Sequence, residues 1–203
     1  IVLPKPAQEL LSVDRQTLTP DQLVQAVLCA KVDLLWNGGI GTYVKSHRES
    51  HVDAADPAND SVRVNAEQLR ARVIGEGGNL GLTQRARVDF ALRGGRVNAD
   101  FIDNAAGVAT SDREVNLKIA LESVCRSGQL TEVQRNARLT AAENDVAATV
   151  LSGCHNQVLA LGLAEAYAPR LLNRHERLIE SLERHNGLNR TAEGLPSESE
   201  IAA

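Results

Sequence analysis

Two short segments carry the side chains that could bind a small polar ligand. The first, Glu76-Gly77-Gly78-Asn79, follows the short apolar stretch 72–75. A Gly pair permits positive φ and a close approach of backbone to ligand, and the Asn79 amide can donate to and accept from a ribose or carboxamide. The same residues also fit a strand-to-helix turn in which Asn79 only caps the next helix. The sequence leaves both interpretations open.

The second segment, residues 104–114, reads NAAGVATSDRE. Its small residues would keep a crevice open at the carboxyl end of a strand, where open α/β sheets bind ligands. Ser111 and Glu114 have the spacing of a capping box, which predicts that a helix starts at Ser111. A helix N-terminus favours a carboxylate, so Ser111 is a candidate carboxylate ligand, a cap of its own helix, or both.

A third glycine-rich segment, 37–42, reads NGGIGT after another apolar stretch. It does not match G-x-G-x-x-G and no helix start follows it, so a tight turn is favoured over a phosphate cradle. All three segments follow predicted strands. Because successive parallel strands end on the same side, we expect these three turns to converge at one edge of a parallel sheet.

The elements that position these turns alternate between helix and strand. Thr19, Pro20 and Gln22 predict a capped helix over 20–30, preceded by an extended lead-in over 1–18. Strands are predicted at 32–36, 72–75 and 97–102, with a helix over 83–92 between the last two. This alternation predicts an α/β fold, the distal half of a doubly wound, Rossmann-like parallel sheet.

Beyond Ser111 the pattern is helical only. Thr131 and Gln134 repeat the capping-box signature, and helices are predicted at 132–151, 158–168 and 170–185. The chain therefore divides into an α/β part, residues 1–110, and a helical continuation, residues 111–203.

Composition restricts the classes of partner. With a net charge of −4 and only five aromatic residues, two Phe, two Tyr and one Trp, the chain has neither a basic stripe nor a stacking platform, so no nucleic-acid partner is predicted. Three separated cysteines favour a reducing cytoplasm over a disulfide framework. The apolar run 158–168 is too short to span a bilayer, so no membrane contact is predicted. The histidines and aspartates of the polar segment 46–61 lack a known ligand spacing, which favours a solvated loop and no metal.

The ordered motifs resemble a known family. E-G-G-N followed by Thr83 resembles the E-G-A-N-x-P-T-T segment of glutamate dehydrogenases, and the segment from Asn104 resembles their N-x-G-G-V-x-x-S-Y-F-E-W segment. The block DLLWNGGIGTYVK, residues 33–45, is more particular. Together these motifs resemble the large, multidomain NAD-specific glutamate dehydrogenases of bacteria, and the resemblance extends to LIESLERHNGLNR near the end of the chain.

The resemblance implies oxidative deamination of L-glutamate to 2-oxoglutarate and ammonia, with hydride passing to NAD. It implies that Gly77, Gly78 and Asn79 contact the cofactor, with Asn79 along a ribose, and that Asn104 approaches the nicotinamide. The remaining implied contacts, to the substrate, come from Val108 and Ser111.

The resemblance has departures: Ala106 replaces a Gly, and aromatic residues of the family are missing at 112, 113 and 115, which changes the local packing.

The resemblance places the family's catalytic lysine and aspartate, its substrate-binding lysines and its glycine-rich phosphate turn upstream of this chain. No catalytic residue is therefore assigned, and Lys45 and Lys118 are interpreted as solvent-facing or capping. The expected parent is a homo-oligomeric NAD-dependent glutamate dehydrogenase, of which this chain is a fragment that is inactive in isolation. The alternative is a non-catalytic α/β scaffold or assembly module with a vestigial nucleotide crevice.

Overall fold

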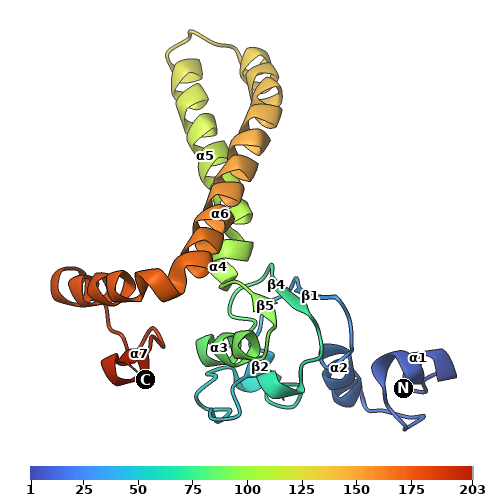
Figure 1. Ribbon diagram of the computed structural model, residues 1–203. Helices are drawn as coiled ribbons and strands as arrows, with labels where there is room; N and C mark the ends of the chain where they lie inside the picture. The colour runs from blue at the N-terminus through green and yellow to red at the C-terminus, as the bar shows by residue number, and fades with distance from the viewer. Residues whose placement is uncertain (203) are drawn as a thin grey trace. The chain divides into compact units, whose positions relative to one another are not determined.

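A computed structural model describes residues 1–202 (Figure 1). The chain divides into two compact units. One contains residues 1–103 together with the chain from Leu172 onward, and the other contains Asn104–Leu171. The first unit carries every strand of the described chain, whereas the second is a pair of helices.

The N-terminal segment differs from the extended lead-in predicted from its two prolines, because α1 occupies Lys5–Leu11. Pro4 is the N-cap and Pro6 lies in the first turn, where a missing N–H costs no helical hydrogen bond. The helix is anchored by a small apolar cluster that is formed by Leu3, Leu11, Leu18 and Ala30. Tertiary burial therefore selects a helix that the local pattern did not indicate.

The next helix, α2 (Pro20–Leu28), begins as predicted. The Gln22 N–H donates to Thr19 Oγ1 at 3.2 Å, and the Thr19 N–H donates to Gln22 Oε1 at 3.1 Å. Both halves of the capping box are present, so two of the unpaired N–H groups at this helix start are satisfied locally.

Two small parallel sheets follow. In the first, β4 (Val73–Glu76) lies between β1 (Leu34–Asn37) and β5 (Arg96–Val97). In the second, β2 (Val44–Lys45) pairs with β3 (Val64–Asn65). The 3₁₀ turns η1 (Pro57–Asn59) and η2 (Ala66–Gln68) flank β3, and α3 (Gln84–Leu92) connects β4 to β5. The predicted mixed α/β class is confirmed at this level.

The core of the first unit is mainly aliphatic. Its completely buried side chains include Val44, Ile74 and Leu82, and Ala86 and Phe90 of α3 pack against the same cluster. The core thus joins both sheets to α3, which fixes the turn that leads from β4 into this helix.

The predicted strand over 97–102 is wrong beyond Val97. α4 (Asp100–Asp103) replaces it and α5 (Ala105–Arg126) follows at once. The side chains of Asp100 and Asp103 accept hydrogen bonds from the backbone of the β4 turn, at the N–H groups of Leu80 and Glu76. These bonds need the two carboxylates on one turn of helix rather than on alternating faces of a strand.

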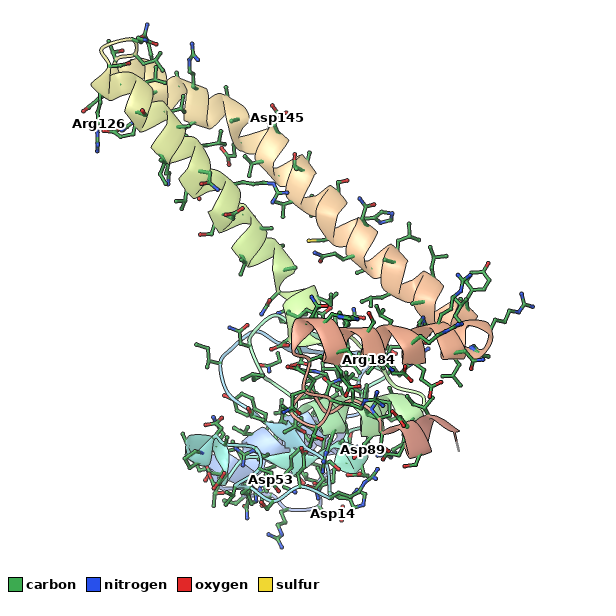
Figure 2. The ribbon with its side chains drawn as sticks, turned by 90° about the vertical axis from the view of Figure 1, so that its left-hand side faces the viewer. Asp14, Asp53, Asp89, Arg126, Asp145 and Arg184 are labelled. Atoms are coloured by element: carbon green, nitrogen blue, oxygen red, sulfur yellow. The ribbon has the colours of Figure 1, made fainter. Side chains whose placement is uncertain are left out.

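The second unit is a helical hairpin of α5 and the first part of α6 (Glu132–Asn186), which lie side by side in Figures 1 and 2. Gly128 (φ +74) lies in the turn, and the predicted capping box of Thr131 and Gln134 is present. Arg135 of α6 reaches Glu122 of α5 at 2.7 Å. Val150 is the buried residue of the two helices.

The three helices predicted over 132–185 are one helix of 55 residues that includes Pro169. A Pro inside a helix removes one backbone hydrogen bond but need not end the helix. Helix α6 ends before Gly187 (φ +69), as predicted. A final short helix, α7, spans Glu198–Ala202.

By length and composition, α6 also contains a window apolar enough to cross a membrane. Its mean hydropathy is 1.3, and 6% of the window is buried. The apolar run over 158–168 was predicted to be too short, but α6 is continuous over Glu132–Asn186, so a longer apolar window lies within one helix. An amphipathic helix that covers another apolar surface meets the same criterion, so this finding does not by itself place α6 in a membrane.

Candidate cofactor site

Two of the three predicted turns, at 37–42 and 76–79, meet at one edge of the three-stranded sheet. β1 and β4 are parallel and in register, with Asn37 opposite Glu76 at their carboxyl ends. The Gly78 N–H donates to the Asn37 carbonyl at 3.0 Å. A Cβ on Gly78 would lie 1.8 Å from the Gly39 carbonyl oxygen, so the two glycine-rich turns touch through their backbones.

The glycines of this edge also accommodate the single tryptophan. A Cβ on Gly75 would lie 2.6 Å from the Trp36 ring, and one on Gly77 would lie 2.4 Å from it. Gly77 is therefore required by the ring of Trp36, and Gly78 by the turn at Gly39. Protein atoms occupy the space that these glycines leave open, so packing inside the protein explains both residues.

The turn after β4 is held by a buried ion pair. Glu76 is 0% exposed, and Arg87 of α3 binds both of its oxygens, with Nε 2.6 Å from Oε1 and Nη2 3.0 Å from Oε2. The Leu82 N–H donates to Oε2 at 3.1 Å. A buried carboxylate is costly unless it is paired and hydrogen-bonded in this way. Arg87 also lies 3.3 Å from Asp100 of α4, which makes it the centre of a three-residue network.

The backbone donors of this turn are used inside the protein. The Leu80 N–H donates to Asp100 Oδ2 at 2.7 Å, the Glu76 N–H donates to Asp103 Oδ2 at 2.9 Å, and the Gly78 N–H is bound to Asn37. A pyrophosphate would need such donors. This turn therefore suits contact with a ribose or an amide better than with a phosphate.

The Asn79 amide is exposed and does not cap α3. The N-cap is Thr83, whose Oγ1 accepts the Ala86 N–H at 3.1 Å and whose hydroxyl donates to Glu49 Oε2 at 2.6 Å. The interpretation of Asn79 as a helix cap is thus wrong. An exposed amide beside a backbone turn fits a ribose hydroxyl or a carboxamide, and Asn79 is the residue of this turn that could hold one.

The remaining site candidates lie on α5 in the second unit. Asn104 is the N-cap of this helix, and Val108 and Ser111 follow at helical spacings of four and three residues. Positions i, i+4 and i+7 share one face of a helix. Val108 is 72% exposed and Ser111 is also exposed. The three candidates thus share one face of the helix, on which Asn104 is partly buried and Val108 and Ser111 are exposed. The turn predicted from the sequence did not anticipate this arrangement.

The predicted helix start at Ser111 is wrong, because α5 begins at Ala105 and Ser111 lies almost two turns inside it. The Ala105–Gly107 segment is the first turn of this helix and not an open loop. Unpaired N–H groups occur only in the first turn of a helix, so they cannot assist Ser111 in binding a carboxylate. Its hydroxyl is the group that could contact a ligand.

The polar segment over 46–61 is more ordered than a solvated loop. Asp56 Oδ2 accepts the Thr42 N–H at 2.8 Å and Asn59 Nδ2 at 2.7 Å, and these bonds lower the pKa of the Asp56 carboxyl. Arg63, 4% exposed, donates to the Thr42 carbonyl at 2.7 Å and to Asp60 at 2.5 Å. The segment therefore anchors the end of the glycine-rich turn at Thr42.

Lys45, which was predicted to be solvent-facing or capping, is instead buried. It is 9% exposed, and its Nζ donates to the Glu49 carbonyl and to Asn65 Oδ1, both at 2.7 Å. Lys118 on α5 is exposed and pairs with Glu114 one turn earlier. Lys45 joins β2 to β3, and both lysines have structural partners.

Sequence reasoning missed the residues that shape the site. Glu76 was noted only as the start of a motif, and Trp36, Arg87 and Asp100 were not considered. A charged residue at the end of an apolar strand is a signal that a partner exists, but the sequence cannot identify that partner. The positions of α3 and α4 relative to β4 are needed to identify Arg87 and Asp100.

Comparison with known proteins agrees with the motifs. The model of the family described as the catalytic domain of bacterial NAD-glutamate dehydrogenase matches residues 1–164. An NAD-specific glutamate dehydrogenase of Pseudomonas aeruginosa is 52% identical over 94% of this chain. Those of Halomonas elongata and Mycobacterium tuberculosis are 46% identical over 96% of the chain and 49% identical over 91% of it.

The chain spans only 11–12% of the length of these relatives. The matched family region covers both the strand-bearing residues up to Asp103 and most of the helical hairpin. The agreement of the family model with three relatives over more than nine-tenths of the chain shows the family. This chain belongs to the bacterial NAD-glutamate dehydrogenase family, within its catalytic domain.

Proposed function

We propose that this chain is a segment of an NAD-dependent glutamate dehydrogenase. The parent enzyme would oxidise L-glutamate to 2-oxoglutarate and ammonia and pass a hydride to NAD. The family match over residues 1–164, with relatives of 46–52% identity that carry this name, is the observation that supports the proposal. We also propose that the parent enzyme is cytoplasmic and homo-oligomeric.

The three-stranded sheet is proposed to be the distal part of a doubly wound cofactor domain. Two features support this: β1, β4 and β5 are all parallel, and α3 connects β4 to β5 as a crossover helix. The glycine-rich turns lie at the carboxyl ends of β1 and β4, where open α/β sheets bind ligands.

In the first unit, Asn79 would hold a ribose of the cofactor through its exposed amide. Gly77 and Gly78 would act indirectly, because their missing side chains let the turn pack on Trp36 and Gly39 and so set the position of Asn79. The cofactor supplies the hydride acceptor, and the residues of this turn would contribute binding and orientation.

In the second unit, Asn104 would contact the carboxamide of the cofactor, whereas Val108 and Ser111 would contact the substrate. Their common helical face supports related roles. Ser111 would donate its hydroxyl hydrogen to the side-chain carboxylate of glutamate, a contact that an apolar amino acid could not use.

Assay of the complete parent protein with glutamate and NAD tests the function directly. We expect NADH formation that depends on both, and an Asn79→Ala change that raises the KM for NAD more than that for glutamate. Asn156→Ala, an exposed change on α6, is the matched control and should leave both constants unchanged. Absence of glutamate-dependent NADH formation in a folded parent would favour a non-catalytic scaffold or assembly module instead.

A further inference from the structure

Three potential metal ligands that belong to none of the roles assigned above lie close together in the strand-bearing unit. His47 follows β2, Glu67 lies in η2, and Asp89 lies in α3. One ligand atom from each lies within 4.8 Å of the others, and His47 Nδ1 is 2.5 Å from Glu67 Oε1. Figure 2 labels Asp89 among the side chains of the strand-bearing unit.

The burial of the three side chains is graded. The Asp89 side chain is 9% exposed, that of Glu67 is 33% exposed and that of His47 is 58% exposed. The cluster thus has a buried floor and a side open to solvent. An ion could enter from the side of His47 without any movement of the core.

Two carboxylate oxygens of the cluster lack partners. Asp89 Oδ1 is bound by Arg48 at 2.9 Å and Glu67 Oε1 by His47, but Glu67 Oε2 and Asp89 Oδ2 are buried without a hydrogen-bond donor among the described residues. A buried carboxylate oxygen without a partner is costly, and two neighbouring carboxylates repel each other. A cation between them would relieve both penalties.

We propose that His47, Glu67 and Asp89 bind one divalent transition-metal ion of the Zn²⁺ type, with water completing its coordination. One imidazole nitrogen and two carboxylates suit Zn²⁺, Mn²⁺ or Co²⁺, whereas Ca²⁺ and Mg²⁺ prefer oxygen ligands alone. Ligands at about 2.1 Å from a tetrahedral ion lie roughly 3.4 Å apart, so small side-chain shifts close the observed spacing. The polar segment after β2, interpreted from the sequence as having no metal, therefore contributes a ligand.

The ion would act as a structural crosslink. It would tie the segment after β2 and the turn η2 to α3, which carries Arg87 and so holds the carboxylate of Glu76. This role is independent of the proposed dehydrogenase activity. The competing explanation is that ion pairs within the protein, of Arg48 with Asp89 and of His47 with Glu67, satisfy the carboxylates without a metal.

Zn²⁺ titration of the chelator-treated chain, followed by calorimetry against a competing chelator, tests the proposal. We expect one ion per chain. His47→Gln and Asp89→Asn should each weaken binding by at least about tenfold, because loss even of a partner that only orients a metal ligand costs about 10- to 100-fold in affinity. His51→Gln is the matched control, because His51 belongs to the same polar segment but contacts Arg63 and Asp60 instead. It should bind Zn²⁺ like the original chain.

A thermal melt with and without Zn²⁺ supplies a second measurement. Binding to the folded state alone should raise the Tm of the original chain and of His51→Gln, and leave that of His47→Gln unchanged. If Asp89→Asn does not fold, Glu67→Gln replaces it, because Glu67 is only partly buried. Equal Zn²⁺ affinity in the original chain and the ligand variants, or no Zn²⁺-dependent change in Tm, would overturn the proposal in favour of the ion pairs.

Discussion

Arg87 binds both oxygens of Glu76 at the end of β4, with contacts of 2.6 and 3.0 Å, and both side chains are almost completely buried. This pair joins the last residue of the central strand to α3, so it fixes the path of the turn that carries Asn79. Removing two charges from water offsets much of their attraction. The pair is therefore better understood as a positioning device than as a source of net stability.

Removing one member of this pair should be strongly destabilising. In Arg87→Met the Glu76 carboxylate stays buried without its main partner, which typically costs about 3–5 kcal/mol. Urea unfolding of the chain measures the change. Arg72→Met is the control, since Arg72 and Asp33 form an exposed pair, 81% and 88% exposed, and surface pairs contribute only about 0–1 kcal/mol. Equal losses in the two variants would contradict the assigned role of Arg87.

Gly78 of the β4 turn should differ from Gly39 of the β1 turn in its tolerance of alanine. A Cβ on Gly78 would lie 1.8 Å from a backbone oxygen, whereas one on Gly39 meets no atom within 4 Å. Gly78→Ala should therefore cost about 1–3 kcal/mol through overpacking, and Gly39→Ala should be close to neutral. Because Trp36 is the single tryptophan and lies against this turn, its fluorescence during unfolding reports both variants.

Asp56 should make the stability of the chain sensitive to acid. Its carboxylate accepts hydrogen bonds from Thr42 and Asn59, which lower its pKa in the folded state. The ionised form is thus favoured by folding, so its contribution is present above the unfolded pKa of about 3.9 and is lost as pH falls through the folded pKa. The stability difference between the original chain and Asp56→Asn should shrink over that range. Asp14→Asn, an exposed change, is the control and should show a smaller pH-dependent difference.

Ser111→Ala separates a substrate contact from a structural one in the parent enzyme. Ser111 lies inside α5, where Ala has the higher helix propensity, so the melting temperature should hold or rise slightly. Loss of a hydrogen bond to a charged group should cost about 1.5–3 kcal/mol, or roughly tenfold to a hundredfold in kcat/KM for glutamate. The KM for NAD should change little. Unchanged glutamate kinetics would exclude the substrate contact.

The 203-residue chain alone should not oxidise glutamate. It spans 11–12% of its relatives, and positioning and charge stabilisation cannot be supplied by part of a cleft. Incubation with glutamate and NAD should give no NADH, and titration with NAD should show weak binding or none. Steady NADH formation by the purified chain would contradict this expectation.

Local sequence signals predicted the elements whose stability is local. The capping boxes at Thr19 and Thr131 were found correctly, as were α3 and the strands that became β1 and β4. These features depend on residues three or four positions apart, or on short apolar runs. The parallel pairing of β1 with β4 then followed from connectivity, and it placed two of the three glycine-rich turns together.

The elements that were predicted incorrectly depend on partners far away in the sequence. Residues 98–102 continue a short apolar stretch that was predicted as a strand, yet Asp100 and Asp103 form a helix, and their carboxylates bind the backbone of the β4 turn. Because α4 ends at Asp103, α5 begins at Ala105 rather than at the predicted Ser111. Pro169 is a second example. A proline usually ends a helix, but α6 continues through Pro169.

The sequence by itself determined the family and the α/β class, because ordered motifs and hydrophobic periodicity survive without coordinates. Only the tertiary structure decided what the motif residues touch: Gly77 packs on Trp36, Arg87 binds Glu76, and Asp89 approaches His47. These contacts join residues far apart in the chain, and they depend on burial, which no local pattern encodes.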